Sequence, residues 1–579
     1  MQKTATSLDI VFRMFPKSVL LKIAAIGMGM VLLDTFGVGL VLPFANIALH
    51  PEGLQQHLQS LPLICMLCPA TDAGAGVRIV IIAALAFLCI LALKGVLSYG
   101  LNRKYAETVA DAQLDLTQRV MRLTLDAEYK VFIEANASRF IQPFVWQIDY
   151  SIVCLQSAAT VCVEASLLLL LAAFAVYLNA SLALFLALAV AAYSVLLKFA
   201  VLDKMGAVGR RRFQAKTRWN HMIFGMVSAI RDIKIMNLES LMYGEFSDIA
   251  RGLRHIGARN IALQHYPKLL GELFFMVALS ILIGTVSLMK DKAAYDVPAL
   301  VAFVVVVLRM IPSVQMIYSQ LNSYEHSSAS MEQLEMTSGD LSRHRHRTIP
   351  CERPFERHIR IENVSYSYPG HDRKALDRVC VEIPKNQLVA IVGSSGSGKS
   401  TFLDVCCGLL KATDGRFFMD DTPIDPFESD AVRRLIGYVP QQVNLLDDSI
   451  GYNISLRANY KEDMDRVVKA AQVSRIHDYI ESLPERYDAP VGERGINLSG
   501  GQRQKIGIAR ALYRNPGILL LDEATSAIDP GAEQEMFEEF FRMRVSMTIL
   551  FATHKIHRIE KSDSIIVFER GRIVGVGTH

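Results

Sequence analysis

The chain has 579 residues, which is too many for one hydrophobic core, so more than one domain is expected. Apolar residues make up 51% of it and its mean hydropathy is +0.27, which is unusual for an entirely soluble protein. The net charge of +4 is the small difference between 61 basic and 57 acidic side chains, so no global field indicates a nucleic-acid partner.

The first half of the chain carries a series of apolar stretches that each approach or exceed the roughly 20 residues needed to cross a bilayer. These stretches lie near residues 18–48, 77–101, 144–178, 180–202, 270–289 and 296–319. Lys and Arg are frequent in 102–140 and 203–268 and absent from 50–76. Because basic residues favour the cytosolic side, we expect six spans with both termini in the cytosol. The N-terminus lacks a clear cleavage site, which predicts a retained first span. This feature and the order of the domains, membrane domain first, favour a bacterial cytoplasmic membrane, with an organelle membrane as the alternative.

The two basic segments between spans have helical periodicity and few Gly or Pro. The membrane helices are therefore expected to continue into the cytosol. Short coupling helices near 127–133 and 239–246 would lie at the tips of these extensions and could dock on a soluble domain.

The composition changes around 333–356, where Ser, Thr, His and Arg dominate. We therefore expect a transmembrane domain over 1–335, a linker over 336–356 and a soluble domain over 357–579. In this last segment, strands rich in Val and Ile alternate with helical stretches, which predicts an α/β fold.

Nine cysteines are scattered along the chain without the spacing of a disulfide framework. Most of those in apolar or helical contexts are expected to be small core residues, namely Cys89, Cys154, Cys162, Cys406 and Cys407. Cys65 and Cys68 lie in the first extramembrane loop, where a redox or metal pair is an alternative to two unremarkable thiols.

A phosphate-binding loop is predicted directly after the apolar strand 388–392. Its residues are Gly393, Ser394, Ser395, Gly396, Ser397, Gly398, Lys399, Ser400 and Thr401, and a helix follows. Glycines let backbone N–H groups converge on phosphate oxygens, and the helix N-terminus adds positive potential. Lys399 would neutralise the β and γ phosphates of ATP, and the Ser400 hydroxyl could ligate Mg²⁺.

A second apolar strand, 518–521, ends in two adjacent carboxylates, Asp522 and Glu523. Asp522 would hold Mg²⁺, and Glu523 would act as the base that polarises the attacking water. Together with the phosphate loop, this pair predicts hydrolysis of a nucleoside triphosphate.

Between these motifs lies Leu498-Ser499-Gly500-Gly501-Gln502, and this pentapeptide resembles the signature of the ABC ATPase family. The resemblance implies that Tyr368 stacks on adenine, that Gln441 senses Mg²⁺, and that His554 lies near the γ-phosphate. It further implies that 526–529 is the loop exchanged between partners and that 491–495 is the segment through which exporters contact their coupling helices.

The same resemblance implies that two such domains enclose two ATP molecules. Each ATP is held by the phosphate loop of one domain and by Ser499, Gly500, Gly501 and Gln502 of the other. One chain carries one such domain with all hydrolytic positions, so a homodimer with two competent sites is expected. Related ATP domains continue by about another helix beyond residue 579, so the chain is either cut there or has a short tail.

Ionisable residues inside the predicted spans are candidates for a substrate site. Lys94, Lys268 and Arg309 could form a cationic belt for a phosphate or pyrophosphate head group. The alternative is that they reach the interface or pair with acidic residues of other spans, which are Asp34, Glu164 and Glu272.

Segments 37–44 and 308–313 resemble the branch of ABC exporters that flip lipid-linked oligosaccharides. The implied cargo is an amphiphile with an anionic head, taken from membrane lipid. A peptide or drug exporter would use the same ATPase, and a non-transporting ABC regulator would bind ATP without substrate-stimulated turnover, so both classes remain alternatives.

Overall fold

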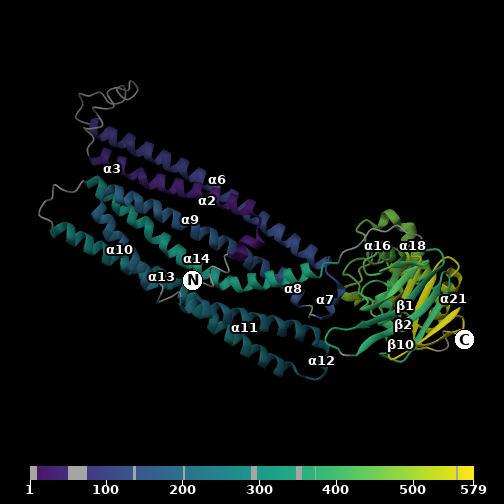
Figure 1. Ribbon diagram of the computed structural model, residues 1–579. Helices are drawn as coiled ribbons and strands as arrows, with labels where there is room; N and C mark the ends of the chain where they lie inside the picture. The colour runs from purple at the N-terminus through teal and green to yellow at the C-terminus, as the bar shows by residue number, and fades with distance from the viewer. Residues whose placement is uncertain are drawn as a thin grey trace. The chain divides into compact units, whose positions relative to one another are not determined.

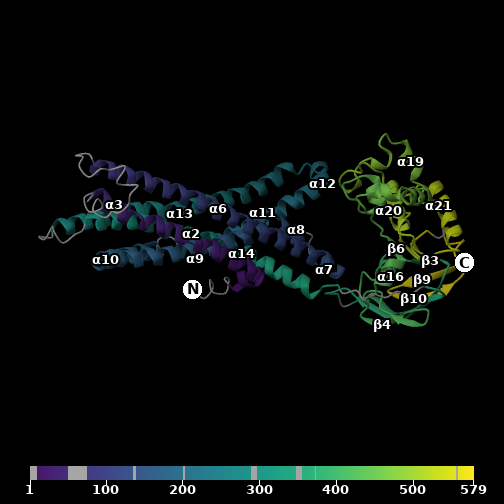
Figure 2. The same ribbon diagram turned by 90° about the horizontal axis from the view of Figure 1, so that it is seen from above.

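The computed structural model describes residues 9–49, 75–134, 138–197, 199, 203–288, 297–346, 355–371, 373–555 and 559–579. It divides into a helical unit, Met1–Asp126 with Asn136–Arg343, and an α/β unit, Ala127–Ala135 with His344–His579. Figures 1 and 2 show the elements of each unit.

The helical unit is built from long helices that run side by side (Figure 1). Its helices are α2 Lys17–Gly39, α3 Val41–Leu49, α6 Ala75–Leu125, α8 Ser138–Gln142, a π-helical turn Pro143–Gln147, α9 Ile148–Leu178, α10 Ala180–Leu197, α11 Asp203–Ser228, α12 Ile230–Ile235, α13 Glu239–Leu288 and α14 Val297–Arg343. Leu167 and Leu171 of α9 pack against Val31 of α2 and Phe303 and Val306 of α14 in one apolar core. Helices α2, α9 and α14 therefore form the centre of this unit.

Four helices of the described residues are long and apolar enough to cross a membrane. They are Lys17–Ala48, Val80–Leu125, Phe140–Leu178 and Val301–Arg343. The fourth predicted span, 180–202, contains the shorter apolar helix α10, and the fifth, 270–289, falls in the last part of α13. Helices occupy all six predicted stretches, while the number of spans stays a prediction.

Two predicted boundaries differ from the structure. The linker was expected to begin at 336, but α14 continues to Arg343, because Leu334 and Leu341 are buried along the same helix. The second coupling helix was expected over 239–246, but those residues form the beginning of α13. The short helix lies before it as α12, and Asn237, with φ of 53°, separates the two helices.

The α/β unit contains two sheets. A four-stranded sheet has the order β2-β1-β4-β5, with β1 His358–Ser367, β2 Lys374–Pro384, β4 Asp414–Met419 and β5 Thr422–Ile424. A six-stranded sheet has the order β10-β9-β3-β8-β7-β6, with β3 Leu388–Gly393, β6 Ile436–Val439, β7 Ile518–Asp522, β8 Thr548–Thr553, β9 Ser564–Glu569 and β10 Arg572–Gly577. The α/β class and the strands predicted at 388–392 and 518–521 are thus confirmed.

The helices of this unit are short. They are α7 Tyr129–Glu134, α15 Lys399–Cys406, α16 Asp430–Leu435, α17 Ile450–Ser455, α18 Met464–Val473, α19 His477–Ser482, α20 Gly500–Tyr513 and α21 Pro530–Met543, with 3₁₀ turns at Tyr460–Asp463, Arg486–Asp488 and Glu493–Gly495. Helix α7 covers most of the first predicted coupling helix. The backbone N–H of Glu128 donates to the carbonyl of His344 at 2.8 Å, so the segment before α7 is tied to the α/β unit.

Strand β3 lies between two apolar cores because its side chains alternate between the faces of the sheet. Val389 and Ile391 belong to the core shared with the four-stranded sheet, whereas Leu388 and Ala390 belong to the core on the other face. A strand buried on both faces reads as a continuous apolar run, which is why it was visible in the sequence.

The cysteines only partly follow their prediction. Cys154 and Cys407 are buried and Cys406 is partly buried, but Cys89 and Cys162 are exposed on the helical unit. Helical periodicity alone did not distinguish the packed face of a membrane helix from its outer face, since both are apolar. Cys65 and Cys68 lie outside the described residues.

Candidate active site

The six-stranded sheet brings four segments to one edge. Strands β3, β8, β7 and β6 are parallel neighbours in that order, and the carboxyl ends of parallel strands meet at the same edge. These strands end at Gly393, Thr553, Asp522 and Val439. The residues that follow each strand therefore gather at a single site, as the sequence motifs require.

The phosphate loop is folded around its own lysine. Gly398 has φ of 108°, and a Cβ there would lie 2.7 Å from the carbonyl oxygen of Ala375, so only glycine fits this position. Lys399 Nζ donates to the carbonyl oxygens of Gly393 at 2.9 Å and Ser394 at 3.0 Å. An ammonium group enclosed by a glycine-rich turn at a helix N-terminus is a site for phosphate oxygens.

Ser400 and Asp522 meet beside the loop. The Ser400 hydroxyl donates to Asp522 Oδ1 at 3.0 Å. Burial raises the pKa of Asp522, the bond from Ser400 opposes this rise, and the charge of Glu523 adds to it. A hydroxyl and a buried carboxylate are oxygen ligands of the kind that Mg²⁺ prefers when phosphates supply further oxygens. The residues present therefore fit the predicted magnesium site.

Glu523 lies beside Gln441 and His554, two residues that the family resemblance singles out. Gln441 Nε2 donates to Glu523 Oε2 at 3.0 Å, and His554 Nδ1 lies 3.7 Å from Oε1. Glu523 has φ of 48°, a left-handed conformation that costs a non-glycine residue on the order of 1–3 kcal/mol. Such strain is typical of functional positions, and here it turns the carboxylate toward Gln441 and His554.

The signature segment forms the start of α20. The Ser499 hydroxyl accepts from the backbone N–H of Gln502, and the Gln502 side chain accepts from the backbone N–H of Ser499. Ser499 caps the helix and stays exposed. A Cβ at Gly501 would lie 2.8 Å from the carbonyl oxygen of Ala527, so the signature packs closely on the predicted exchange loop.

Comparisons with known proteins agree with this geometry. Residues 376–526 match the family described as ABC transporter. The solved structure of a bacterial Atm1-family ABC exporter with ATP bound superimposes with a TM-score of 0.78 over 97% of this chain and 96% of that one, at 24% sequence identity. The chain has the ABC exporter fold and carries an ABC transporter domain.

Curated relatives resemble part of the chain. An uncharacterized ABC transporter ATP-binding protein of Bacillus subtilis is 40% identical over 221 residues, 38% of each chain. An ATP-dependent lipid A-core flippase of Shewanella sp. strain MR-4 is 39% identical over 222 residues, and one of Albidiferax ferrireducens is 30% identical over 378 residues, 65% of each chain. The matched part of this chain covers 38% of the length of the Bacillus subtilis relative.

Tyr368 lies beside the phosphate loop of the ABC domain. Its hydroxyl is 3.1 Å from the Thr401 hydroxyl, and its ring meets the Tyr366 ring edge to face with centroids 5.1 Å apart. The ring is only partly buried, and its stacking on adenine stays a prediction.

Sequence reasoning missed two groups in the ABC domain. Gln504 donates to the Ser526 hydroxyl at 3.2 Å and accepts from the backbone N–H of Ala527 at 2.9 Å, so it fastens the exchange loop to α20. Asp404, one turn after Ser400, accepts from the Tyr438 hydroxyl at 3.0 Å. For both Gln504 and Asp404, the sequence shows only a polar residue in a helix that also has a buried face, which does not identify its partner.

The candidate substrate residues of the helical unit are not free cations. Lys94 Nζ lies 3.0 Å from Asp34 Oδ1, and Arg309 donates to Asp34 Oδ2 at 2.7 Å, so α2, α6 and α14 are joined by one carboxylate. This is the pairing that the sequence left open for these residues. The Lys268 side chain lies outside the described residues. Glu164 and Glu272 are not part of the described ion pairs of either cation.

Proposed function

We propose that the chain is an ATP-driven exporter that acts as a homodimer and flips an amphiphile with an anionic head. The observation that carries this proposal is the convergence of Lys399, Asp522 with Ser400, and Glu523 at one sheet edge. The same chain contains helices long and apolar enough to cross a membrane. ATP hydrolysis is thus joined to a membrane unit in one polypeptide.

The hydrolytic step follows from the placement of the side chains. Glu523 accepts a proton from the attacking water, and Gln441 and His554 orient that carboxylate. Lys399 exchanges its loop carbonyls for phosphate oxygens when ATP binds. Ser400, Asp522 and Gln441 would hold Mg²⁺, which supplies charge neutralisation at the phosphates.

Dimerisation completes the site. Ser499 is exposed at the start of α20, where its hydroxyl and the helix N-terminus can face the γ-phosphate bound by a partner's loop. Gly500, Gly501 and Gln502 follow it on the same turn. ATP then joins two copies, their closure opens the helical units outward, and hydrolysis resets them.

The substrate class is supported by the charge of one side-chain cluster in the helical unit. Lys94 and Arg309 share the single carboxylate of Asp34, so this cluster of three side chains carries one net positive charge. An uncompensated charge at membrane depth is costly, so an anionic head group would be stabilised there. Several relatives are named lipid A-core flippases, and a lipid-linked oligosaccharide has the same kind of anionic, amphiphilic chemistry. A bacterial inner membrane with both termini cytosolic is the setting that we propose.

The experiment is an ATPase assay of the protein in proteoliposomes, with and without polyprenyl-pyrophosphate-linked oligosaccharide. We expect stimulation by this lipid and not by a neutral polyprenol or a peptide. The combined Lys94→Gln and Arg309→Gln variant should lose the stimulation. Stimulation by peptides alone would identify a peptide exporter, and ATP binding without any stimulated turnover would identify a regulator.

A further inference from the structure

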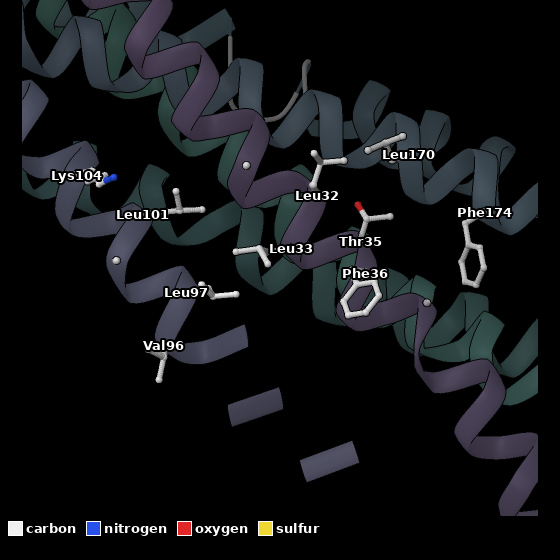
Figure 3. A pocket seen from close by; sticks show the side chains of 13 residues that line it. Leu32, Leu33, Thr35, Phe36, Val96, Leu97, Leu101, Lys104, Leu170 and Phe174 are labelled. Atoms are coloured by element: carbon white, nitrogen blue, oxygen red, sulfur yellow. The ribbon is translucent and has the colours of Figure 1, made fainter. Parts of the chain in front are cut away.

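The helical unit contains an apolar groove of about 970 Å³ outside the ion-paired cluster of Asp34. Three helices line it, and each of them is one of the candidate membrane spans. Figure 3 shows Leu97 and Leu101 on α6 facing Leu33 on α2, with Lys104 at one end and Phe174 of α9 at the other. The remaining lining residues are Gly29, Leu32, Thr35, Phe36, Gly39, Val96, Gly100 and Leu170.

The lining is apolar except at one end. The Thr35 hydroxyl already donates to the carbonyl oxygen of Val31 at 2.8 Å, so it needs no other partner. Lys104 is exposed, and within the described residues its ammonium group has no recorded hydrogen bond or ion pair. Its neighbour Arg103 is paired with Glu107 at 2.9 Å. The groove therefore offers one available positive charge at the end of an apolar surface.

The length of the groove matches the thickness of one membrane leaflet. On α2 the groove runs from Gly29 to Gly39, which is about 15 Å along a helix. This is half of the roughly 30 Å hydrocarbon core of a bilayer. Lys104 and Arg103 follow the apolar part of α6, where basic residues mark the cytosolic interface. The groove therefore extends from the cytosolic interface to about the middle of the membrane.

We propose that this groove binds an anionic phospholipid of the cytosolic leaflet, with its phosphate at Lys104 and one acyl chain along Leu97, Leu101 and Phe36. This inference rests on the proposed membrane location and concerns a bound lipid, not the transported substrate. The groove is apolar along its length, has a cation at one end and is about as long as one leaflet is thick. An anionic phospholipid has the matching features, namely an apolar chain of that length and a negative head group. A helix of a second copy would not require the cation at one end.

The experiment is native mass spectrometry of the full chain. The protein is mixed in detergent with equal amounts of phosphatidylglycerol and phosphatidylcholine that carry identical acyl chains, and the lipids that stay bound after the detergent is removed are measured. The wild type should retain phosphatidylglycerol preferentially. Lys104→Gln should reduce that preference about fivefold, as expected for one interfacial cation. Arg103→Gln, next in sequence but paired and outside the groove, is the matched control and should keep the preference.

A filling variant tests the apolar part. A Cβ at Gly100 would meet no atom within 4 Å, so Gly100→Leu can occupy the groove without a backbone clash. It should reduce retention of both lipids. Equal retention of the two lipids by the wild type would overturn the proposal. So would a Gly100→Leu variant that retains lipid normally but no longer dimerises, because the groove would then be an interface between copies. None of these outcomes depends on ATP hydrolysis, so a failed transport assay leaves them interpretable.

Discussion

Asp404 should make the stability of the ABC domain depend on pH between about 4 and 6. Its carboxylate is partly buried beside the phosphate loop, and this burial raises its pKa to about 6 from the ordinary 3.8, with the Tyr438 hydroxyl opposing the rise and Asp522 adding to it. A raised pKa in the folded state means that the folded protein binds the proton more tightly than the unfolded chain. The corresponding stabilisation is present below pH 4 and is lost as the pH rises through 6.

The magnitude follows from the shift of about two pH units, which is worth on the order of 3 kcal/mol. Asp404→Asn removes the charge, keeps a carbonyl oxygen for the Tyr438 hydroxyl and nearly preserves volume. As the pH rises from 4 to 7.5, the wild type should therefore lose up to this amount of unfolding free energy because Asp404 becomes charged. Asp404→Asn lacks this charge and should not show the loss.

The assay is thermal unfolding of the full chain at several pH values. For a domain of this size the expected change is roughly 6 °C or more in the difference of midpoints. Tyr438→Phe removes the bond that lowers the pKa of Asp404, so its stability should fall over a pH window shifted upward. A midpoint difference between Asp404→Asn and wild type that is the same at every pH would refute the assignment of the buried charge.

Other substitutions test separate parts of the structure. Lys399→Ala should weaken ATP binding about 10- to 100-fold in a fluorescent-nucleotide titration, because a charged hydrogen-bond donor to phosphate is lost, and unchanged affinity would contradict its role. Gly501→Val should cost about 1–3 kcal/mol by overpacking against Ala527 and abolish turnover, whereas normal ATPase activity would show that this contact opens freely. Asp34→Asn should lower the unfolding midpoint clearly more than the exposed-pair control Asp115→Asn, since it leaves two cations without their carboxylate, and equal effects would contradict the three-helix ion pair.

The chemistry of the ATP site could be predicted from the sequence because it depends on contiguous motifs. The phosphate loop requires glycines at fixed spacing before a helix, and Asp522 and Glu523 follow a strand buried on both faces. What brings these motifs together is the order of the parallel strands in the six-stranded sheet, which the motifs themselves do not specify.

The remaining contacts join residues far apart in the chain. Arg309 and Asp34 are separated by 275 positions, and three acidic residues in the spans were equally compatible partners. The bonds of Tyr438 to Asp404 and of Gln504 to Ser526 likewise depend on tertiary neighbours. Local propensity also could not place the end of α14, because the polar segment after 335 continues to bury Leu341 on one face.

The central claim is that ATP hydrolysis at Glu523 drives an anionic amphiphile across a bilayer. The most direct test is the crossing of polyprenyl-pyrophosphate-linked oligosaccharide in proteoliposomes, measured with ATP for the wild type and for Glu523→Gln. We predict ATP-dependent crossing by the wild type, and for the variant retained ATP binding with turnover lowered about 10²- to 10⁴-fold and crossing lost with it. Crossing that continues in Glu523→Gln, or robust wild-type hydrolysis without any crossing, would contradict the account.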